Sequence, residues 1–381
     1  MKIAINCVFF QPKGGGIKEY IYNLVNNISL LDKKNEYILY VLQDQLEYAK
    51  QNFPKELRIK TVPFLSGKLQ YVIKRSLLEQ RFWEKEEHCE KFDIFHSPFF
   101  HSPSFKYAKV ILTVHDLRFY RFPSTYTFLR YLYLKVSVRR SVNKADHIIS
   151  ISNFTKEELR EAYGTPNSKI TVIHEAINQN RFKETTNKSF SENNLMKKLK
   201  SEGFILSVGH IEPRKNYVRL IKAFRLLKKR EEWRNLNLVI VGKKGHNYKP
   251  VLNLVDSVNG IHYLNFVEHE FLIWLYKNAK IFVFPSFYEG FGFPPLEAAC
   301  MDCVSAVSNI SSIPEICGEG VFYFDPFNIE AMEQCIHHAL SDELARENVL
   351  NKMKINIERF SWKQNAEETI NLYNTIGSIS K

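Results

Sequence analysis

The chain has 381 residues, more than one compact core usually holds, so two domains of ordinary size are expected. Hydrophobic residues make up 45% and charged residues 25%, a composition that excludes wholesale disorder. The formal net charge of +12 favours anionic partners, whether phosphorylated ligands, anionic lipid or nucleic acid, without choosing among them.

No apolar run reaches the roughly 18–20 residues that a membrane-spanning helix needs. The opening MKIAINCVFF is typical of a first strand and lacks the long apolar stretch of a signal peptide. Six scattered cysteines suit a reducing cytosol better than a disulfide framework, so a cytoplasmic protein is expected.

Buried strands alternate with amphipathic helices through the first half of the chain, which predicts a parallel sheet with helices on both faces. The strand patterns are IAINCVFF (3–10), EYILYVL (36–42), VILTVHD (110–116) and HIISIS (147–152). The helical patterns are IKEYIYNLVNNISLL (17–31), YLYLKVSVRRSVNKA (131–145) and NFTKEELREAY (153–163).

A polar stretch over 179–203 predicts a linker between a first domain, 1–178, and a second domain, 204–360. The alternation then restarts, which predicts a second doubly wound domain of the α/β class. Its strand patterns are 204–210, 236–242, 261–267, 280–286 and 303–308, and YVRLIKAFRLLKKR (217–230) is an amphipathic helix. Ligands of such sheets bind beyond the carboxyl ends of the strands, so two facing domains are expected to form a deep cleft.

The loop QPKGGGIKEY follows the first strand and contains Gly14, Gly15 and Gly16. Backbone N–H groups of such a loop can approach an anion at the start of a helix. The glycine spacing of the dinucleotide fingerprint is not met, so a simple strand-to-helix turn remains an alternative.

The loop SVGHIEPRKNYVRL opens the second domain in the same way, with Gly209 at the end of a strand. Arg214 and Lys215 stand side by side where a helix is expected to begin. Two cations are unfavourable there, and a bound diphosphate would relieve the conflict. A solvated basic surface is the alternative.

The stretch FPSFYEGFGFPPLEAAC places Glu289 in a loop that turns at Gly290 and Gly292. Two prolines then fit the first turn of a helix, in which Glu297 is expected to lie. Carboxylates at this place can accept hydrogen bonds from sugar or ribose hydroxyls. The alternative for Glu297 is a role confined to the helix dipole.

Three further patterns limit the chemistry. His115 ends a strand within TVHDL and could face the cleft, although a lone histidine is more often structural. No Asp-x-Asp pair and no GxxxxGK[ST] loop occurs, so neither a metal-held nucleotide-sugar nor an ATPase is expected. Cys300 and Cys303 lack a second close pair that would complete a zinc site, and we expect them in the core.

Together these segments resemble the family 4 (group 1) retaining glycosyltransferases of the GT-B fold, particularly the mannosyltransferase-like branch of bacterial surface polysaccharide synthesis. The resemblance extends over almost the whole chain and includes FHSPFFHSP, TVHDLRFYRFPSTYT, ADHIISISNFTKEEL, VGHIEPRKN, the Glu289–Glu297 segment, SSIPEICGEGVFYFDP and FSWKQNAEETINLY. It implies that the final helix crosses back, so that 361–381 completes the first domain.

The resemblance also implies roles for individual residues. Glu289 would contact the donor hexose, Glu297 the ribose, and Arg214 with Lys215 the diphosphate, while the glycine loop lies near the reacting centre and His115 reaches the sugar. It implies catalytic roles for His115, Arg214, Lys215 and Glu289, and nucleotide-sugar contacts at Gly14, Gly15, Gly16, Gly209, Arg214, Lys215, Glu289, Gly290, Phe291, Gly292 and Glu297.

Two departures from the family pattern stand out. Many relatives carry arginine after Gly209, where this chain has His210, so phosphate binding is expected to depend on Arg214 and Lys215. After Glu297 the usual Gly-x-Pro segment is replaced by Met301–Val304, which puts the local turn geometry in doubt.

The stretch 117–145 carries seven Lys or Arg, no acid and seven aromatic residues. Such a surface suits an anionic membrane that carries a lipid-linked acceptor. A core role for the aromatic residues is the alternative, and nucleic acid is a poor second partner because of the sugar-binding pattern elsewhere.

The sequence therefore predicts a metal-independent, cofactor-free hexosyltransferase that moves a sugar, with GDP-mannose as the favoured donor, to a saccharide or lipid-linked acceptor. A peripheral position on the inner face of the membrane is expected. The alternatives are a UDP-sugar-dependent transferase and a catalytically silent sugar- or membrane-binding relative.

Overall fold

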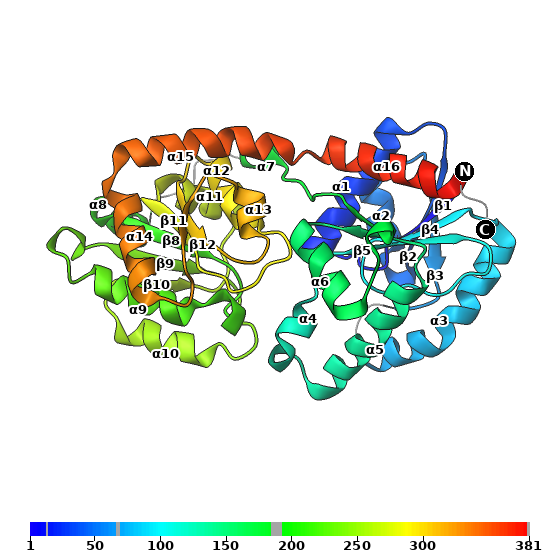
Figure 1. Ribbon diagram of the computed structural model, residues 1–381, viewed down its shortest axis with the longest axis horizontal. Coiled ribbons are helices and arrows are strands. Elements are labelled where there is room, and N and C mark those ends of the chain that lie inside the picture. The colour runs from blue at the N-terminus through cyan, green and yellow to red at the C-terminus, as the bar shows by residue number, and fades with distance from the viewer. Residues whose placement is uncertain (13, 66–68, 184–192, 379–381) are drawn as a thin grey trace. The chain divides into compact units, whose positions relative to one another are not determined.

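The computed structural model describes residues 1–12, 14–65, 69–183 and 193–378, and the chain divides into two compact units (Figure 1). Unit 1 comprises Met1–Arg121, Tyr126–Ala176 and Ser361–Lys381, and unit 2 comprises Phe122–Thr125 and Ile177–Phe360. Each unit holds a parallel sheet with helices on both faces, so the expected α/β class with two doubly wound domains is confirmed.

In the described part of unit 1, seven parallel strands form a sheet in the order β3-β2-β1-β4-β5-β6-β7. The strands are β1 (Lys2–Asn6), β2 (Glu36–Leu42), β3 (Arg58–Val62), β4 (Ile94–Ser97), β5 (Lys109–Val114), β6 (His147–Ser150) and β7 (Ile170–Val172). The helices are α1 (Gly16–Leu31), α2 (Leu46–Asn52), α3 (Leu69–Glu90), α4 (Arg118–Arg121), α5 (Phe128–Lys144), α6 (Asn153–Tyr163) and α16 (Trp362–Ser378).

Alternate side chains of the strands face opposite sides of this sheet, and each side is covered by helices. On one side Ile3 and Ile5 pack with residues of α1, α2 and α16. On the other side Ala4 packs with Trp83 of α3, and Leu112 packs with residues of α5 and α6.

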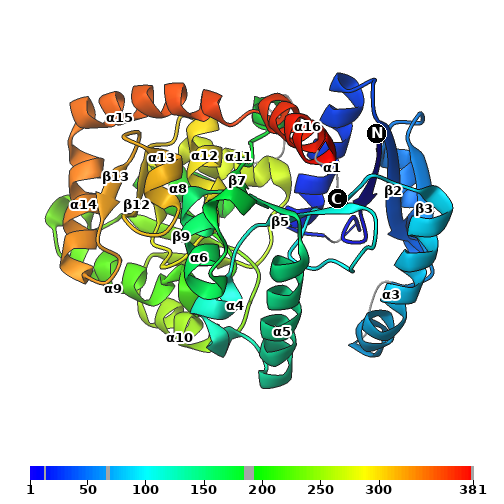
Figure 2. The ribbon, with the colours of Figure 1, turned by 45° about the vertical axis from the view of Figure 1, so that its right-hand side comes forward.

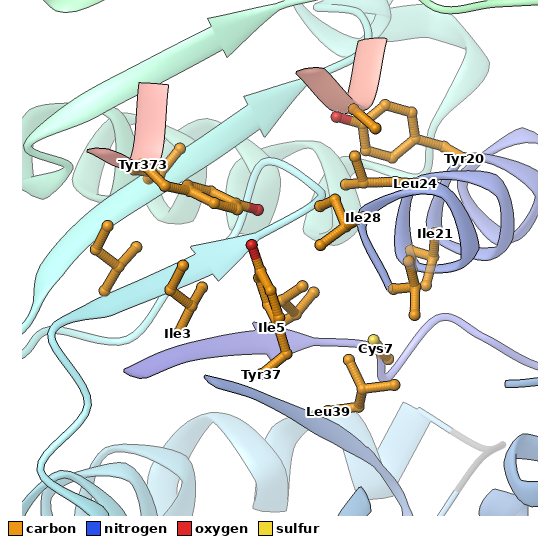
Figure 3. Close-up of a cluster of buried hydrophobic side chains, with 14 of the residues drawn as sticks. Ile3, Ile5, Cys7, Tyr20, Ile21, Leu24, Ile28, Tyr37, Leu39 and Tyr373 are labelled. Atoms are coloured by element: carbon orange, nitrogen blue, oxygen red, sulfur yellow. The ribbon is translucent and has the colours of Figure 1, made fainter. Parts of the chain in front are cut away.

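The C-terminal helix α16 belongs to unit 1, as the resemblance implied, and it packs against α1. Figure 3 shows its Tyr373 above Ile3 and Ile5 of β1, close to Tyr37 of β2. The Tyr373 hydroxyl lies 2.6 Å from Nδ1 of the buried His96 on β4. The last helix of the chain is therefore attached to β1 by apolar packing and to β4 by a hydrogen bond.

Across the described residues of unit 2, six parallel strands follow the order β10-β9-β8-β11-β12-β13. The strands are β8 (Phe204–Val208), β9 (Asn237–Val241), β10 (Ile261–Leu264), β11 (Ile281–Phe284), β12 (Ser305–Ser308) and β13 (Phe322–Phe324). The helices are α7 (Gln179–Lys183), α8 (Asn194–Glu202), α9 (Tyr217–Leu227), α10 (Lys249–Ser257), α11 (His269–Asn278), α12 (Phe293–Cys300), α13 (Ile313–Cys317), α14 (Ile329–Ser341) and α15 (Glu343–Asn356).

Helices α9, α10 and α14 form a core with one face of this sheet, through strand residues such as Ile205 and Val283. Residues of the opposite parity contact α11 instead, since Phe204 stacks with Trp274 and Phe282 packs against Tyr276. Strand β8 pairs with β11 although 72 or more residues separate them in sequence order. The loops after these two strands are therefore neighbours.

The predicted linker falls partly on undescribed residues. The predicted linker 179–203 includes 184–192, which lie outside the described residues, and the chain on either side forms α7 and α8. Where helices are described, none has both the length and the apolarity needed to cross a membrane.

Candidate sugar-nucleotide site

The loops that follow β8 and β11 bring together residues of two sequence motifs, 209–216 and 285–292. The backbone N–H of Phe287 donates to the carbonyl of Arg214 at 2.7 Å, which joins the two loops directly. This contact lies beyond the carboxyl ends of adjacent parallel strands, where open α/β sheets bind ligands.

Glu289 accepts hydrogen bonds from both members of the basic pair. Lys215 Nζ lies 2.6 Å from Glu289 Oε1, and Arg214 Nη1 lies 2.9 Å from Oε2. Arg214 also donates from Nη1 to the carbonyl of Tyr288 and pairs through Nη2 with Glu212 at 2.8 Å. We call Glu212, Arg214, Lys215 and Glu289 the charged cluster.

The charged cluster is largely withdrawn from water, with Lys215 only 7% exposed. Burial alone raises the pKa of Glu289, but the charges of Arg214 and Lys215 overcome it and lower that pKa to about 2. Burial is also the main cause that lowers the pKa of Lys215, and Glu289 partly opposes this shift. Glu289 is therefore a firmly ionised acceptor held beside two cations.

This geometry corrects the prediction that the two cations stand unpaired at the start of a helix. Arg214 and Lys215 lie in a short 3-10 turn, Pro213–Lys215, and α9 begins two residues later at Tyr217. Their repulsion is already offset by Glu212 and Glu289. The sequence spacing concealed this because Glu289 lies 74 residues away.

The backbone around Glu289 is fixed by two serines in front of α13. Ser312 Oγ donates to the carbonyl oxygens of Glu289 and Phe291, and Ser311 Oγ accepts from the N–H of Glu289. Gly290 and Phe291 are buried, and Gly292 has φ +107, a conformation that favours glycine. The predicted turn is therefore present and braced.

Glu297 does not lie in the first turn of α12, contrary to the prediction. The helix begins at Phe293, so Glu297 is its fifth residue and the first turn holds no acid. The reason is that Gly292 is the N-cap, so Phe293 adds a helical residue before the two prolines. Burial raises the pKa of Glu297, while a hydrogen bond of 3.0 Å from the Tyr276 hydroxyl opposes the rise.

Gly209 directly follows β8, in a backbone conformation that would be strained for a residue with a side chain. Its φ is +153, and a Cβ there would come 3.1 Å from the Tyr217 hydroxyl and 3.2 Å from Lys215 Cε. Tyr217 donates to the Gly209 carbonyl at 3.0 Å. The next residue, His210, has a pKa lowered chiefly by burial, so it is neutral at pH 7 and brings no fixed positive charge.

The glycine loop of unit 1 leads directly into α1. Gly14 N–H donates to the Gln11 carbonyl, Gly15 is the N-cap, and Gly16 begins the helix. No atom lies within 4 Å of where a Cβ would stand at Gly15 or Gly16. Open space of this kind leaves the backbone accessible to a ligand.

His115 is engaged through both ring nitrogens. Nδ1 lies 2.6 Å from Glu175 Oε1, and Nε2 lies 2.9 Å from the carbonyl oxygen of Pro98. Burial lowers the pKa of His115, but the charge and hydrogen bond of Glu175, with the Pro98 carbonyl, raise it above its ordinary value. Two acceptors require the doubly protonated imidazolium, which Glu175 neutralises.

Sequence reasoning missed several residues that shape the site. Glu212 directly precedes Pro-Arg-Lys, and an acid so close to two cations is a local signal of an ion pair. Tyr276, Ser312 and Glu175 carried no local signal, because each meets its partner only through the fold. In the described parts of the chain no three His, Cys, Asp or Glu side chains group as a metal site would require.

Residues 14–181 match the family described as "Glycosyltransferase Family 4", and residues 190–360 match "Glycosyl transferases group 1". The chain is 30% identical over 284 residues to "O-antigen chain mannosyltransferase B" of Escherichia coli, covering 74% of each protein. It is 29% identical over 246 residues to "O-antigen chain mannosyltransferase RfbU" of Salmonella typhimurium, covering 62% of this chain and 63% of that protein.

Solved structures share the fold at low sequence identity. A sucrose-phosphate synthase from Thermosynechococcus elongatus has a TM-score of 0.73 at 16% identity and is matched over 99% of both chains. WaaG, a glycosyltransferase of lipopolysaccharide biosynthesis, has a TM-score of 0.69 at 14% identity, covering 97% of this chain and 99% of that one.

Proposed function

Because the chain belongs to the family 4 (group 1) glycosyltransferases, we propose that it transfers a hexose from a nucleotide-sugar to a saccharide or lipid-linked saccharide in surface polysaccharide synthesis. The charged cluster at the carboxyl ends of β8 and β11 carries this proposal. We further propose mannose from GDP-mannose as the donor, which the O-antigen mannosyltransferases among the relatives support.

The charged cluster fits the donor in two ways. Glu289, ionised and acceptor-only, suits the hydroxyl groups of the hexose, whose O–H groups donate. Arg214 and Lys215 suit the diphosphate, and the neutral His210 leaves this task to them. Glu297, on the next helix, suits the ribose hydroxyls.

The reaction breaks the bond between the anomeric carbon and the diphosphate oxygen, and the electron pair leaves with the diphosphate. The acceptor oxygen bonds to the anomeric carbon and loses its proton. Cations already placed for the growing negative charge lower the barrier, because they need no reorganisation during the reaction. We propose that the reaction retains the anomeric configuration and uses no metal and no cofactor. The lack of an Asp-x-Asp pair supports the metal-free part of this proposal.

Roles in unit 1 extend the proposal. The open backbone at Gly15 and Gly16 supports an approach of this loop to the diphosphate. For His115, contact with a sugar hydroxyl requires Nε2 to exchange its bond to the Pro98 carbonyl for one to the ligand. The Glu175 pair would hold the ring in place during that exchange.

We also propose that unit 1 meets the cytoplasmic face of an anionic membrane through α5, which Figure 2 shows along the outside of this unit. One side of α5 is buried, through Leu134, Val138 and Val142. The opposite side, within about 140° of the helix circumference, exposes Phe128, Leu129, Leu132, Tyr133 and Val136. The exposed cations of α5 include Arg130, Lys135, Arg139, Arg140 and Lys144.

This arrangement matches an interfacial helix, with apolar side chains to insert and cations to meet lipid phosphates. Two arginines of 117–145 that lie outside α5 already have partners within the fold. Arg121 pairs with Glu158 at 2.7 Å and with Glu161 at 2.6 Å, both on α6. Arg118 donates through Nε to the Tyr126 hydroxyl. The docking surface is therefore α5 itself.

Transfer assays with single donors test the proposed function. Purified protein would be given GDP-mannose, UDP-glucose or no donor with mannose-containing oligosaccharide acceptors, and released nucleoside diphosphate and extended product would be measured. Turnover with GDP-mannose, lost in Glu289→Gln, supports the proposal. Turnover with UDP-glucose alone would establish the UDP-sugar alternative, and binding without turnover of any donor would establish the silent relative.

A further inference from the structure

Tyr276 is a buried tyrosine whose hydroxyl has a functional neighbour. It lies on α11 with no exposed surface, and its ring packs against Phe282 of β11 with centroids 5.4 Å apart. Its hydroxyl donates to Glu297 Oε2 on α12 at 3.0 Å. A strand and two helices thus fix the position of this one donor.

Toward Glu297 the hydroxyl is the donor. Burial, followed by the charge of Glu297, raises the pKa of Tyr276 well above its ordinary value, so the phenol stays protonated. A carboxylate offers about four acceptor positions over its two oxygens, and Tyr276 fills one of them on Oε2. Among the described residues Tyr276 is the hydrogen-bond donor to Glu297, which leaves Oε1 and the rest of Oε2 for a ligand with two adjacent hydroxyls.

We propose that Tyr276 is a positioning residue that holds the Glu297 carboxylate in the orientation that accepts both ribose hydroxyls of the donor nucleotide. This inference rests on the proposed function, in which Glu297 contacts the ribose. A vicinal diol presents its two donors at a fixed separation, so a carboxylate that rotates freely pairs with them less well. Tyr276 removes that rotation before the ligand arrives.

The test compares nucleotides with and without the diol. Dissociation constants of GDP, UDP and their 2′,3′-dideoxy counterparts would be measured by calorimetry for wild type and Tyr276→Phe. Wild type should bind the better ribonucleotide at least about tenfold more tightly than its dideoxy form, the scale of a hydrogen bond to a charged group. In Tyr276→Phe this preference should fall severalfold, with dideoxy affinity nearly unchanged.

Two further variants separate positioning from folding. Tyr323→Phe removes another tyrosine hydroxyl of unit 2, one that donates to the Gly318 carbonyl, and should leave the preference intact. Glu297→Gln should abolish most of the preference, and adding Tyr276→Phe to it should change little more, because the two residues act through one contact.

Each other outcome is decisive. Equal loss of ribo- and dideoxynucleotide affinity in Tyr276→Phe would make Tyr276 a packing residue and overturn the inference while leaving the proposed function standing. A wild type that binds both forms equally would overturn the ribose role of Glu297 and the inference with it. A wild type that binds neither GDP nor UDP would overturn the proposed function itself.

Discussion

Arg214 and Lys215, the two cations proposed to bind the diphosphate, each already contact a carboxylate of the charged cluster. Glu289 bridges Arg214 and Lys215, and Glu212 lies on the far side of Arg214. Such preorganisation fixes the side chains before ligand binds, at the cost of a competition between carboxylate and phosphate for the same donors. Because these charges are buried, a single substitution also removes a partner from a buried ion pair, so folding stability is measured beside turnover.

Lys215→Met keeps an apolar stem but removes the ammonium, and it should reduce turnover roughly 10²–10³-fold, as loss of one preorganised donor does. Steady-state kinetics with the active donor would measure this. Arg230→Ala is the matched control, because Arg230 pairs with Glu333 elsewhere in unit 2. A Lys215→Met enzyme within threefold of wild type would remove Lys215 from the diphosphate site.

The His115–Glu175 pair should be visible as a titration. Burial acts to lower the pKa of His115, but chiefly Glu175 raises it above 6.5, so we expect its ring to lose its proton at a higher pH than an ordinary histidine does. In Glu175→Gln burial dominates and the pKa should fall below 6.5. Histidine proton resonances followed from pH 5 to 9 would show this shift. His96, whose pKa burial and the nearby charge of His115 lower to about 3, should not titrate there and serves as an internal control.

The same pair contributes stability with a defined sign. Because the folded-state pKa of His115 lies above its unfolded value of 6.5, the contribution is complete below pH 6.5. This stabilisation is lost as pH rises through the folded-state pKa. Its full size is about 1.4 kcal/mol for each unit by which the folded-state pKa exceeds the unfolded one. Equal titration of His115 in wild type and Glu175→Gln would show that the contact is not formed in solution.

At the scale of the element, α5 carries two apolar sides where a surface helix of a globular protein carries one. Leu129 is 76% exposed and Phe128 is 74% exposed, while Leu134 and Val138 on the other side are buried. Exposed apolar groups of this size gather where a protein meets a partner or a membrane. The stretch 117–145 carries seven Lys or Arg and no acid, which supports the proposed contact with an anionic membrane.

Replacing Arg130, Arg139 and Arg140 with glutamine should weaken binding to anionic vesicles, by up to about 1 kcal/mol for each cation near the surface. Leu129→Gln with Leu132→Gln should weaken it as well, and that loss should depend little on salt because it is apolar. Vesicle sedimentation at low and moderate salt would measure both effects.

Arg121→Gln is the control for this experiment, since its guanidinium already pairs with α6 and should contribute little to vesicle binding. Turnover on a soluble acceptor should persist in the α5 variants. If the α5 variants sedimented with vesicles as well as wild type, the exposed side chains of α5 would not bind the membrane. If the protein bound nucleic acid in a salt-dependent way instead, nucleic acid would be the favoured partner.

For the molecule as a whole, the proposed donor contacts of unit 2 come from loops at neighbouring carboxyl strand ends of one sheet, and those of unit 1 begin at the loop after β1. None of these loops contains an Asp-x-Asp pair. In the proposed metal-free mechanism, the charge balance for a diphosphate comes from side-chain cations and backbone N–H groups.

Activity should therefore survive EDTA. We expect turnover after chelation to stay within about twofold of the untreated enzyme, and nucleoside diphosphate at about 100 Kd to add about 2.7 kcal/mol of stability with or without chelator. Activity assays and thermal shifts in parallel would measure both. Loss of turnover that Mn²⁺ restores would contradict the metal-free mechanism.

The α/β class, most strands and the principal motifs can be predicted from the amino-acid pattern alone. The patterns at 36–42 and 153–163 coincide with β2 and α6, because buried strands and amphipathic helices have periodicities that a single chain displays. Strands β3, β4, β7 and β13 had no clear pattern. Strand β3 is a partly exposed edge, and β4, β7 and β13 are only three or four residues long.

Which charges and hydroxyls come into contact depends on the three-dimensional fold. Glu289 reaches Lys215 across 74 residues, His115 reaches Glu175 across 60, and Arg121 reaches Glu158 across 37. A hydrogen bond depends on distance and direction in space, and a motif records neither between segments that lie far apart in the chain. The order β8-β11 of the folded sheet, which no local pattern specifies, is what brings the two halves of the charged cluster together.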